Sequence, residues 1–209
     1  MKTERKQKIT AVAAHRQPDL AVVLENIHDA HNVGAVLRTC DSVGVQSVFL
    51  LNTEDIPLKN MVLGKRTSSG TRKWLDIRLF RDREACFAHL RKHYQFIFAT
   101  HLAADAVSLY DLDLTRSMAL VFGNEHSGIS DETLRLCDGN FAIPQFGFAQ
   151  SLNISVSCAV TLYEALRQRL RAGMYGPNTK LTDAQKQQLV DKFTEIHESR
   201  YKGRTPRQQ

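Results

Sequence analysis

The sequence contains no apolar run long enough to cross a bilayer and no CxxC pair of cysteines. A membrane-spanning helix needs about 20 predominantly apolar residues, and a signal peptide needs an apolar core that residues 1–16 lack. The cysteines are far apart, which is typical of small buried side chains in a reducing compartment rather than of zinc ligands or disulfides. They are Cys40, Cys86, Cys137 and Cys158. We therefore expect a cytoplasmic protein with no membrane partner and no metal.

An excess of charge of either sign is also missing from most of the chain. Residues 21–196 contain equal numbers of basic and acidic side chains, so the formal charge of +6 comes from the two ends. Residues 1–20 carry five Lys or Arg against two acids, and residues 197–209 carry four against one. Basic ends are typical of proteins that bind nucleic acid, although solvated tails have the same composition.

Short apolar runs alternate with amphipathic segments, which predicts an α/β fold with a parallel sheet flanked by helices. We expect strands near residues 21–24, 46–51, 74–80, 94–99, 119–122 and 141–143. Helices are expected after residue 31, over 82–93, and from about 151 to Gly173.

Further helices are expected at the two ends of the chain. The last one begins at a capping box over residues 182–185 and has a narrow apolar stripe. We expect that stripe to pack on the domain, on a partner subunit or on residues 12–14. The chain then divides into a basic N-terminal extension (1–20), one central domain (21–173) and a C-terminal helix with a basic tail (174–209).

Two of the expected strands end in glycine-bearing loops, at residues 123–128 and 144–150. Open α/β sheets bind ligands at the carboxyl edge of their strands, where these loops lie. The spacing of Gly123 and Gly128 matches half of a phosphate-binding P-loop, but Ile129 and Ser130 stand where that motif requires Lys and Ser or Thr. Binding of a nucleoside triphosphate therefore has little support. Turn chemistry explains many of these polar residues, and Ser151 fits the N-cap of the following helix.

Asn32 and Arg38 belong to the helix expected after residue 31, whose apolar residues share one face. Asn32 fits an N-cap. Arg38 is less easily explained, because a helical side chain leans toward the N-terminus and a cation is unfavourable there. Gly34, one turn earlier, leaves a groove for the guanidinium. Residues that break a local rule in this way are expected at functional sites.

Three stretches form an ordered set: NVGAVLR at 32–38, VFGNEHSG at 121–128, and IP at 143–144 followed by QSLNIS at 150–155. Together they closely resemble the three motifs of the SPOUT-fold RNA 2′-O-ribose methyltransferases. The nearest subgroup is TrmH, which methylates guanosine-18 of tRNA. The resemblance extends from about Arg16 to Tyr175. It implies S-adenosylmethionine as cofactor, tRNA as substrate, a homodimer, and a deep trefoil knot at the C-terminal cofactor site.

The resemblance also implies roles for individual residues. The catalytic set would be Arg38, Asn32, Glu125, Ser151 and Asn153. The cofactor would be bound by Thr100, Gly123, Asn124, Ile143, Ser151 and Leu152. For RNA contacts we expect Arg16, His31, Lys65, Arg66, Arg167, Arg169, Arg200 and Lys202. Guanidinium resists deprotonation, so Arg38 is expected to bind phosphate and stabilise an alkoxide rather than to act as a base.

Two alternatives remain, a ribosomal RNA methyltransferase of the same fold and a non-catalytic RNA-binding relative. The ribosomal enzymes of this kind usually carry a separate RNA-binding domain before the catalytic one, whereas about twenty residues precede the first expected strand here. A non-catalytic relative would be expected to have lost Arg38 or the cofactor loop, and both are present.

Overall fold

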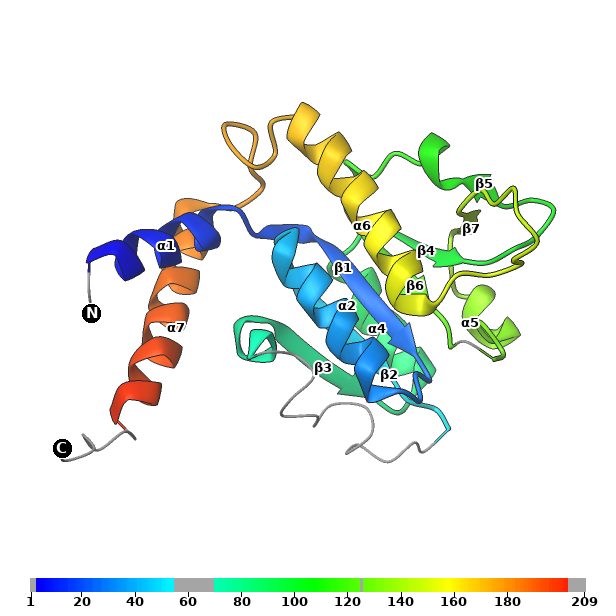
Figure 1. Cartoon of the computed structure of the whole chain (residues 1–209), viewed down its shortest axis with the longest axis horizontal. Coiled ribbons are helices and arrows are strands. Elements are labelled where there is room, and N and C mark those ends of the chain that lie inside the picture. Colours follow the sequence, from blue (N-terminus) through cyan, green and yellow to red (C-terminus); the bar gives the residue numbers. More distant parts are fainter. Residues whose placement is uncertain (1–2, 55–69, 125, 203–209) are drawn as a thin grey trace.

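A computed structural model of the chain describes residues 3–54, 70–124 and 126–202, with side chains described up to residue 199 (Figure 1). Seven strands in these ranges form one sheet in the order β3-β2-β1-β6-β4-β7-β5, and every pair of neighbours is parallel. The strands are β1 (Gln17–Glu25), β2 (Val45–Leu51), β3 (Asp76–Phe80), β4 (Phe96–Thr100), β5 (Val107–Ser108), β6 (Met118–Phe122) and β7 (Gly139–Ala142). The predicted α/β class and parallel sheet are confirmed.

The helices connect these strands and flank the sheet. They are α1 (Thr3–Ala14), α2 (Ala30–Ser42), α4 (Arg83–Arg91), α5 (Asp131–Leu134), α6 (Ile154–Arg171) and α7 (Asp183–Lys202), with 3-10 turns η1 (Thr71–Trp74) and η2 (Leu109–Asp111). Several details differ from the predictions. Strand β1 begins at Gln17, inside the expected N-terminal extension (1–20). Trp74 ends a 3-10 turn instead of starting β3, and the two-residue strand β5 was not expected, because it is too short to show an apolar pattern.

The alternation of side chains along β1 separates two cores. Leu20, Val22 and Leu24 face one core, and Ala21 and Val23 face the other. Helices α2 and α6 lie side by side over the first face, and α4 covers the second (Figure 1). Both faces are buried, which explains why the central strands are almost continuously apolar.

Helices α1 and α7 pack against each other at one end of the molecule (Figure 1). Their shared core contains Ile9, Ala13 and Phe193, and the Trp74 ring meets the Phe193 ring edge-on at 5.6 Å between centroids. Of the three places expected for the narrow stripe of the last helix, the structure shows contact with two, the N-terminal segment and, through Trp74, the domain. The predicted capping box is confirmed, because Gln185 N donates to the Thr182 hydroxyl while Thr182 N donates to Gln185 Oε1.

The part of the chain that the structure describes covers residues 3–54, 70–124 and 126–202. No helix there is long and apolar enough to span a membrane. No cluster of three or more His, Cys, Asp or Glu side chains there is arranged to hold a metal ion.

Candidate active site

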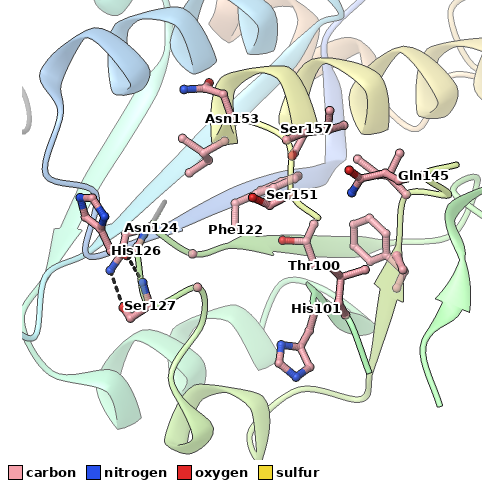
Figure 2. A pocket seen from close by; sticks show the side chains of 18 residues that line it. Thr100, His101, Phe122, Asn124, His126, Ser127, Gln145, Ser151, Asn153 and Ser157 are labelled. Atoms are coloured by element: carbon pink, nitrogen blue, oxygen red, sulfur yellow. Dashed lines mark hydrogen bonds between the residues drawn. The ribbon is translucent and has the colours of Figure 1, made fainter. Parts of the chain in front are cut away.

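A pocket of about 600 Å³ opens at the carboxyl ends of β4, β6 and β7, beside the start of α6 (Figure 2). Parallel strands leave their carboxyl ends at one edge, so the loops that follow them converge there. The wall is built from Thr100, His101, Leu102, Phe122, Gly123, Asn124, His126, Ser127, Gly128, Phe141, Ala142, Ile143, Gln145, Ser151, Leu152, Asn153, Ile154 and Ser157.

The loop after β6 is a tight turn closed on itself. Asn124 and Gly128 exchange backbone hydrogen bonds at 3.1 Å, and Asn124 Oδ1 accepts from the backbone N–H groups of His126 and Ser127 (Figure 2). A Cβ on Gly123 would lie 2.1 Å from the carbonyl of Gly128, so the closed turn leaves room only for glycine. The Asn124 side chain and backbone therefore both hold the loop closed beside the pocket.

The loop after β7 leads into α6, and Asn153 is the N-cap of that helix. Asn153 Oδ1 accepts from Ser155 N at 2.8 Å and from the Ser155 hydroxyl at 2.6 Å. In the sequence Ser151 also fitted the N-cap of this helix, but it does not have that role. Ser151 stands two residues earlier and is exposed in the pocket wall. Its hydroxyl is thereby available to a ligand.

Asn153 also connects two of the three motif stretches. Its Nδ2 donates to Asn32 Oδ1 at 3.2 Å, across 121 residues of sequence. In the sequence Asn32 also fitted an N-cap, but it does not cap α2. Asp29 has that role, accepting from His31 N at 2.8 Å. Because the cap lies three residues earlier, Asn32 is in the first helical turn, and its side chain meets the pocket wall at Asn153.

The predicted cofactor residues gather in one place. Thr100, Gly123, Asn124, Ile143, Ser151 and Leu152 all lie in the pocket wall. Of the catalytic set, Ser151 and Asn153 line the pocket, while Asn32 and the exposed Arg38 belong to the adjoining α2. Glu125 lies outside the described residues.

Sequence reasoning missed several residues of the wall. His101, His126, Gln145 and Ser157 are polar side chains that line the pocket. His101 and His126 both follow the carboxyl end of a strand, and that position was the signal that could have identified them.

Most of the chain is similar in sequence to a known protein family. Residues 19–163 match the SpoU rRNA Methylase family. The chain belongs to this family.

Several curated relatives at 33–44% identity are named tRNA (guanosine(18)-2′-O)-methyltransferase. One from Thermus thermophilus is 44% identical over 172 residues, covering 82% of this chain and 86% of the relative. One from Escherichia coli is 39% identical over 191 residues, covering 91% and 82%. Both alignments cover most of this chain and most of the relative.

Solved structures show the same fold. The Aquifex aeolicus TrmH/SpoU tRNA modifying enzyme is 33% identical with a TM-score of 0.82, covering 93% of this chain and 96% of that one. An AdoMet-bound rRNA methyltransferase from Sinorhizobium meliloti is 27% identical with a TM-score of 0.62, covering 74% of this chain but 59% of that one. The similarity to the tRNA enzyme thus extends over almost the full length of both chains.

Two arginines predicted to contact RNA are part of the protein interior, and those two predictions were wrong. Arg169 is fully buried and donates to the carbonyls of Leu114 and Arg116, to Gln17 Oε1 at 3.1 Å and to Asp19 Oδ1 at 2.5 Å.

Arg16 is 1% exposed, and its guanidinium meets Asp41 at 2.5 Å and lies over the Phe193 ring. Arg16 and Arg169 are thus each paired with a carboxylate in the protein interior, so neither presents its charge to a phosphate.

The other predicted RNA contacts fall into two groups. His31 is exposed at the start of α2, and Arg167 is exposed on α6 with its guanidinium bound to Glu164 at 2.7 and 2.8 Å. These hydrogen bonds lower the pKa of the Glu164 carboxyl. Lys65 and Arg66, and the side chains of Arg200 and Lys202, lie outside the described residues.

Proposed function

We propose that this chain transfers the methyl group of S-adenosylmethionine to the ribose 2′-hydroxyl of guanosine-18 in tRNA. The observation that carries the proposal is the meeting of the three motif stretches at one edge of the sheet. The loops at 123–128 and 144–153 form the pocket, and the Asn153–Asn32 hydrogen bond joins them to α2. The names and full-length similarity of the curated tRNA enzymes support tRNA as the substrate.

The pocket suits S-adenosylmethionine in size and chemistry. Small-molecule sites typically enclose about 300–1,000 Å³ and combine apolar walls with a few placed polar groups. Here the apolar part comes from Leu102, Ile143 and Leu152, while Thr100 and Ser151 supply hydroxyl groups. We assign the cofactor to these residues together with the backbone of Gly123 and Asn124. When bound, S-adenosylmethionine supplies an electrophilic methyl group.

Arg38 is the residue to which we assign stabilisation of the ribose oxygen. A guanidinium is a positively charged hydrogen-bond donor, so it favours the negative charge that develops on the attacking oxygen. We assign orientation of the ribose to Asn32, Asn153 and Glu125. The Asn153–Asn32 bond supports this role, because it fixes two amide groups between the cofactor pocket and the helix that carries Arg38.

The RNA would extend from the pocket to exposed basic and polar residues outside its wall. We propose contacts from His31 and Arg167, which are exposed on adjoining helices, and from Lys65, Arg66, Arg200 and Lys202 on the basis of their charge in the sequence. A tRNA substrate places the reaction in the cytoplasm.

A homodimer is part of the proposal. Helix α6 exposes Val156, Tyr163 and Leu170 at seven-residue spacing, with 45%, 54% and 55% of each residue accessible. Such a stripe lies along one side of a helix, and a packed partner would remove it from water. The trefoil knot is proposed from the resemblance to SPOUT enzymes. The three-part division at residues 20 and 173 is proposed from the sequence, although β1 begins at Gln17 and so crosses the first boundary.

Methylation of defined transcripts tests the function. Purified protein, tRNA and labelled S-adenosylmethionine should yield 2′-O-methylguanosine at position 18 alone, and a tRNA carrying 2′-deoxyguanosine at that position should accept no label. Transfer only to ribosomal RNA fragments would favour the ribosomal alternative. Binding of tRNA without any transfer would favour a non-catalytic RNA-binding protein.

A further inference from the structure

Glu25 ends strand β1 and is a buried carboxylate that the proposed mechanism does not use. Only 1% of the residue is exposed. A carboxylate removed from water requires hydrogen-bond donors around it. Glu25 Oε1 accepts from the hydroxyls of Ser130 at 2.7 Å and Thr133 at 2.6 Å, and Oε2 accepts from Ser130 N at 3.1 Å.

Arg83 on α4 fixes the direction of these hydrogen bonds. Its Nε donates to the Thr133 hydroxyl at 2.8 Å, one terminal nitrogen donates to the Ser130 hydroxyl at 3.1 Å, and that nitrogen lies 3.6 Å from Glu25 Oε1. Each hydroxyl has one proton, and guanidinium can only donate. Both hydroxyl protons must therefore point to Glu25, which acts solely as an acceptor.

This network fastens the loop after β6 where the loop returns to the sheet. The loop leaves β6 at Phe122, which is paired with Leu24 of β1. It returns at Ser130, the N-cap of α5, which is bound to Glu25. The two ends of the loop are thus attached to consecutive residues of one strand, and the pocket-lining segment lies between them.

The same strand end also leads to α2. Asn26 has a left-handed backbone with φ of +50°, which is uncommon outside glycine and is found at functional sites. Its side chain is held by Thr53, because Asn26 Nδ2 donates to the Thr53 hydroxyl and Thr53 N donates to Asn26 Oδ1, both at 2.9 Å. Three residues later Asp29 caps α2, the helix of Asn32 and Arg38.

We propose that Glu25 is a positioning residue for methyl transfer. Its carboxylate holds the cofactor-lining loop after β6 against the strand end that leads into α2, because it binds Ser130 at the return end of that loop, and the chain runs from Glu25 through Asn26 to Asp29, the N-cap of α2. The inference rests on the proposed function. A displacement of about 1 Å between reacting groups can lower a rate by about a hundredfold, so a loosened Glu25 network reduces turnover without removing any group that touches substrate.

The test variant is Glu25→Gln, which keeps the shape of the side chain. With its amide oxygen directed at the two hydroxyls, its NH2 group faces Ser130 N–H, so two donors oppose each other at the 3.1 Å contact. The matched control is Asp138→Asn. Asp138 Oδ2 accepts from Ile97 N at 2.7 Å and from Arg91 at 2.5 Å, but it precedes β7 and lies at the amino end of the strands.

At saturating tRNA and cofactor we expect Glu25→Gln to lower kcat by about ten- to a hundredfold. Calorimetry should show weaker binding of S-adenosylmethionine, while the dissociation constant for tRNA and all values for Asp138→Asn stay within about threefold of the parent. Thr133→Val, which removes one donor, should shift kcat in the same direction, and Thr133→Ser, which keeps the hydroxyl, should restore it.

Two results would overturn the positioning role. One is equal behaviour of Glu25→Gln and Asp138→Asn in kcat and cofactor binding. The other, should Glu25→Gln not fold, is a Thr133→Val protein with normal kcat and cofactor affinity. The cofactor measurement needs no RNA, so a parent protein that methylates no tRNA would refute the proposed substrate while weaker cofactor binding by Glu25→Gln would still support the positioning role.

Discussion

Replacing Arg169 by alanine should destabilise the whole fold, although the residue sits in a basic segment that looks suited to RNA. Its guanidinium is fully buried and bonds two backbone carbonyls, Gln17 and the carboxylate of Asp19. The alanine variant leaves that carboxylate and the other acceptors without their donor. Removing one partner of a buried ion pair costs about 3–5 kcal/mol.

The expected change in melting temperature follows from the size of the chain. For 150–250 residues each kcal/mol corresponds to about 2–4 °C, so Arg169→Ala should melt about 6–20 °C below the parent protein. Arg167→Ala is the matched control, because Arg167 is two residues away, is exposed and bonds only the neighbouring Glu164 among the contacts found for its side chain in the described residues. We expect little change in its stability.

Circular dichroism during heating and in urea measures both variants. The protein concentration is kept the same, because the stability of the proposed dimer would depend on it. Arg169→Lys should fall between alanine and arginine, since an ammonium keeps the charge but does not reproduce the planar fork. The reasoning would be refuted if Arg169→Ala were as stable as Arg167→Ala, with tRNA affinity reduced instead.

Three other predictions concern the site and the pH dependence. Arg38→Ala should abolish turnover. Calorimetry should show cofactor affinity within about fivefold of the parent, because Arg38 lies on α2, beside the pocket and not in its wall. Near-normal turnover would mean that another residue stabilises the ribose oxygen. Gly123→Ala should lose cofactor binding, because a Cβ would lie 2.1 Å from loop backbone, whereas Gly147→Ala, with no atom within 4 Å of its Cβ, should bind normally; equal affinities would contradict the closed turn. Burial, followed by the charge of Arg78, lowers the pKa of His89 below its ordinary value near 6.5. The unfolded chain therefore binds this proton more readily, so stability should decrease as pH falls from about 6.5, and His89→Gln should flatten urea midpoints measured across that range.

The sequence alone determined the class of fold and the place of the site. Local signals were sufficient, because buried strands are apolar runs and glycine-bearing loops follow two of them at 123–128 and 144–150. The order of the strands then brings those loops to one edge, as expected for parallel β-strands. Helix boundaries were less certain. Asp29 and Asn153 cap α2 and α6 in place of Asn32 and Ser151, since several neighbouring polar residues can fill a cap and only the backbone path selects one.

Only the tertiary structure decided which charges face water and which polar groups meet. Arg169 binds Asp19 across 150 residues, Asn153 binds Asn32 across 121, and Thr133 binds Glu25 across 108. The residues next to an arginine in the sequence do not indicate that it will bind a carboxylate 150 residues away. Burial is a property of the packed molecule, because it depends on which elements cover a side chain. For that reason Arg16 and Arg169, whose charge suggested RNA contacts, form part of the protein interior. Glu25 likewise became a candidate positioning residue only once the structure showed the hydroxyl groups that bind it.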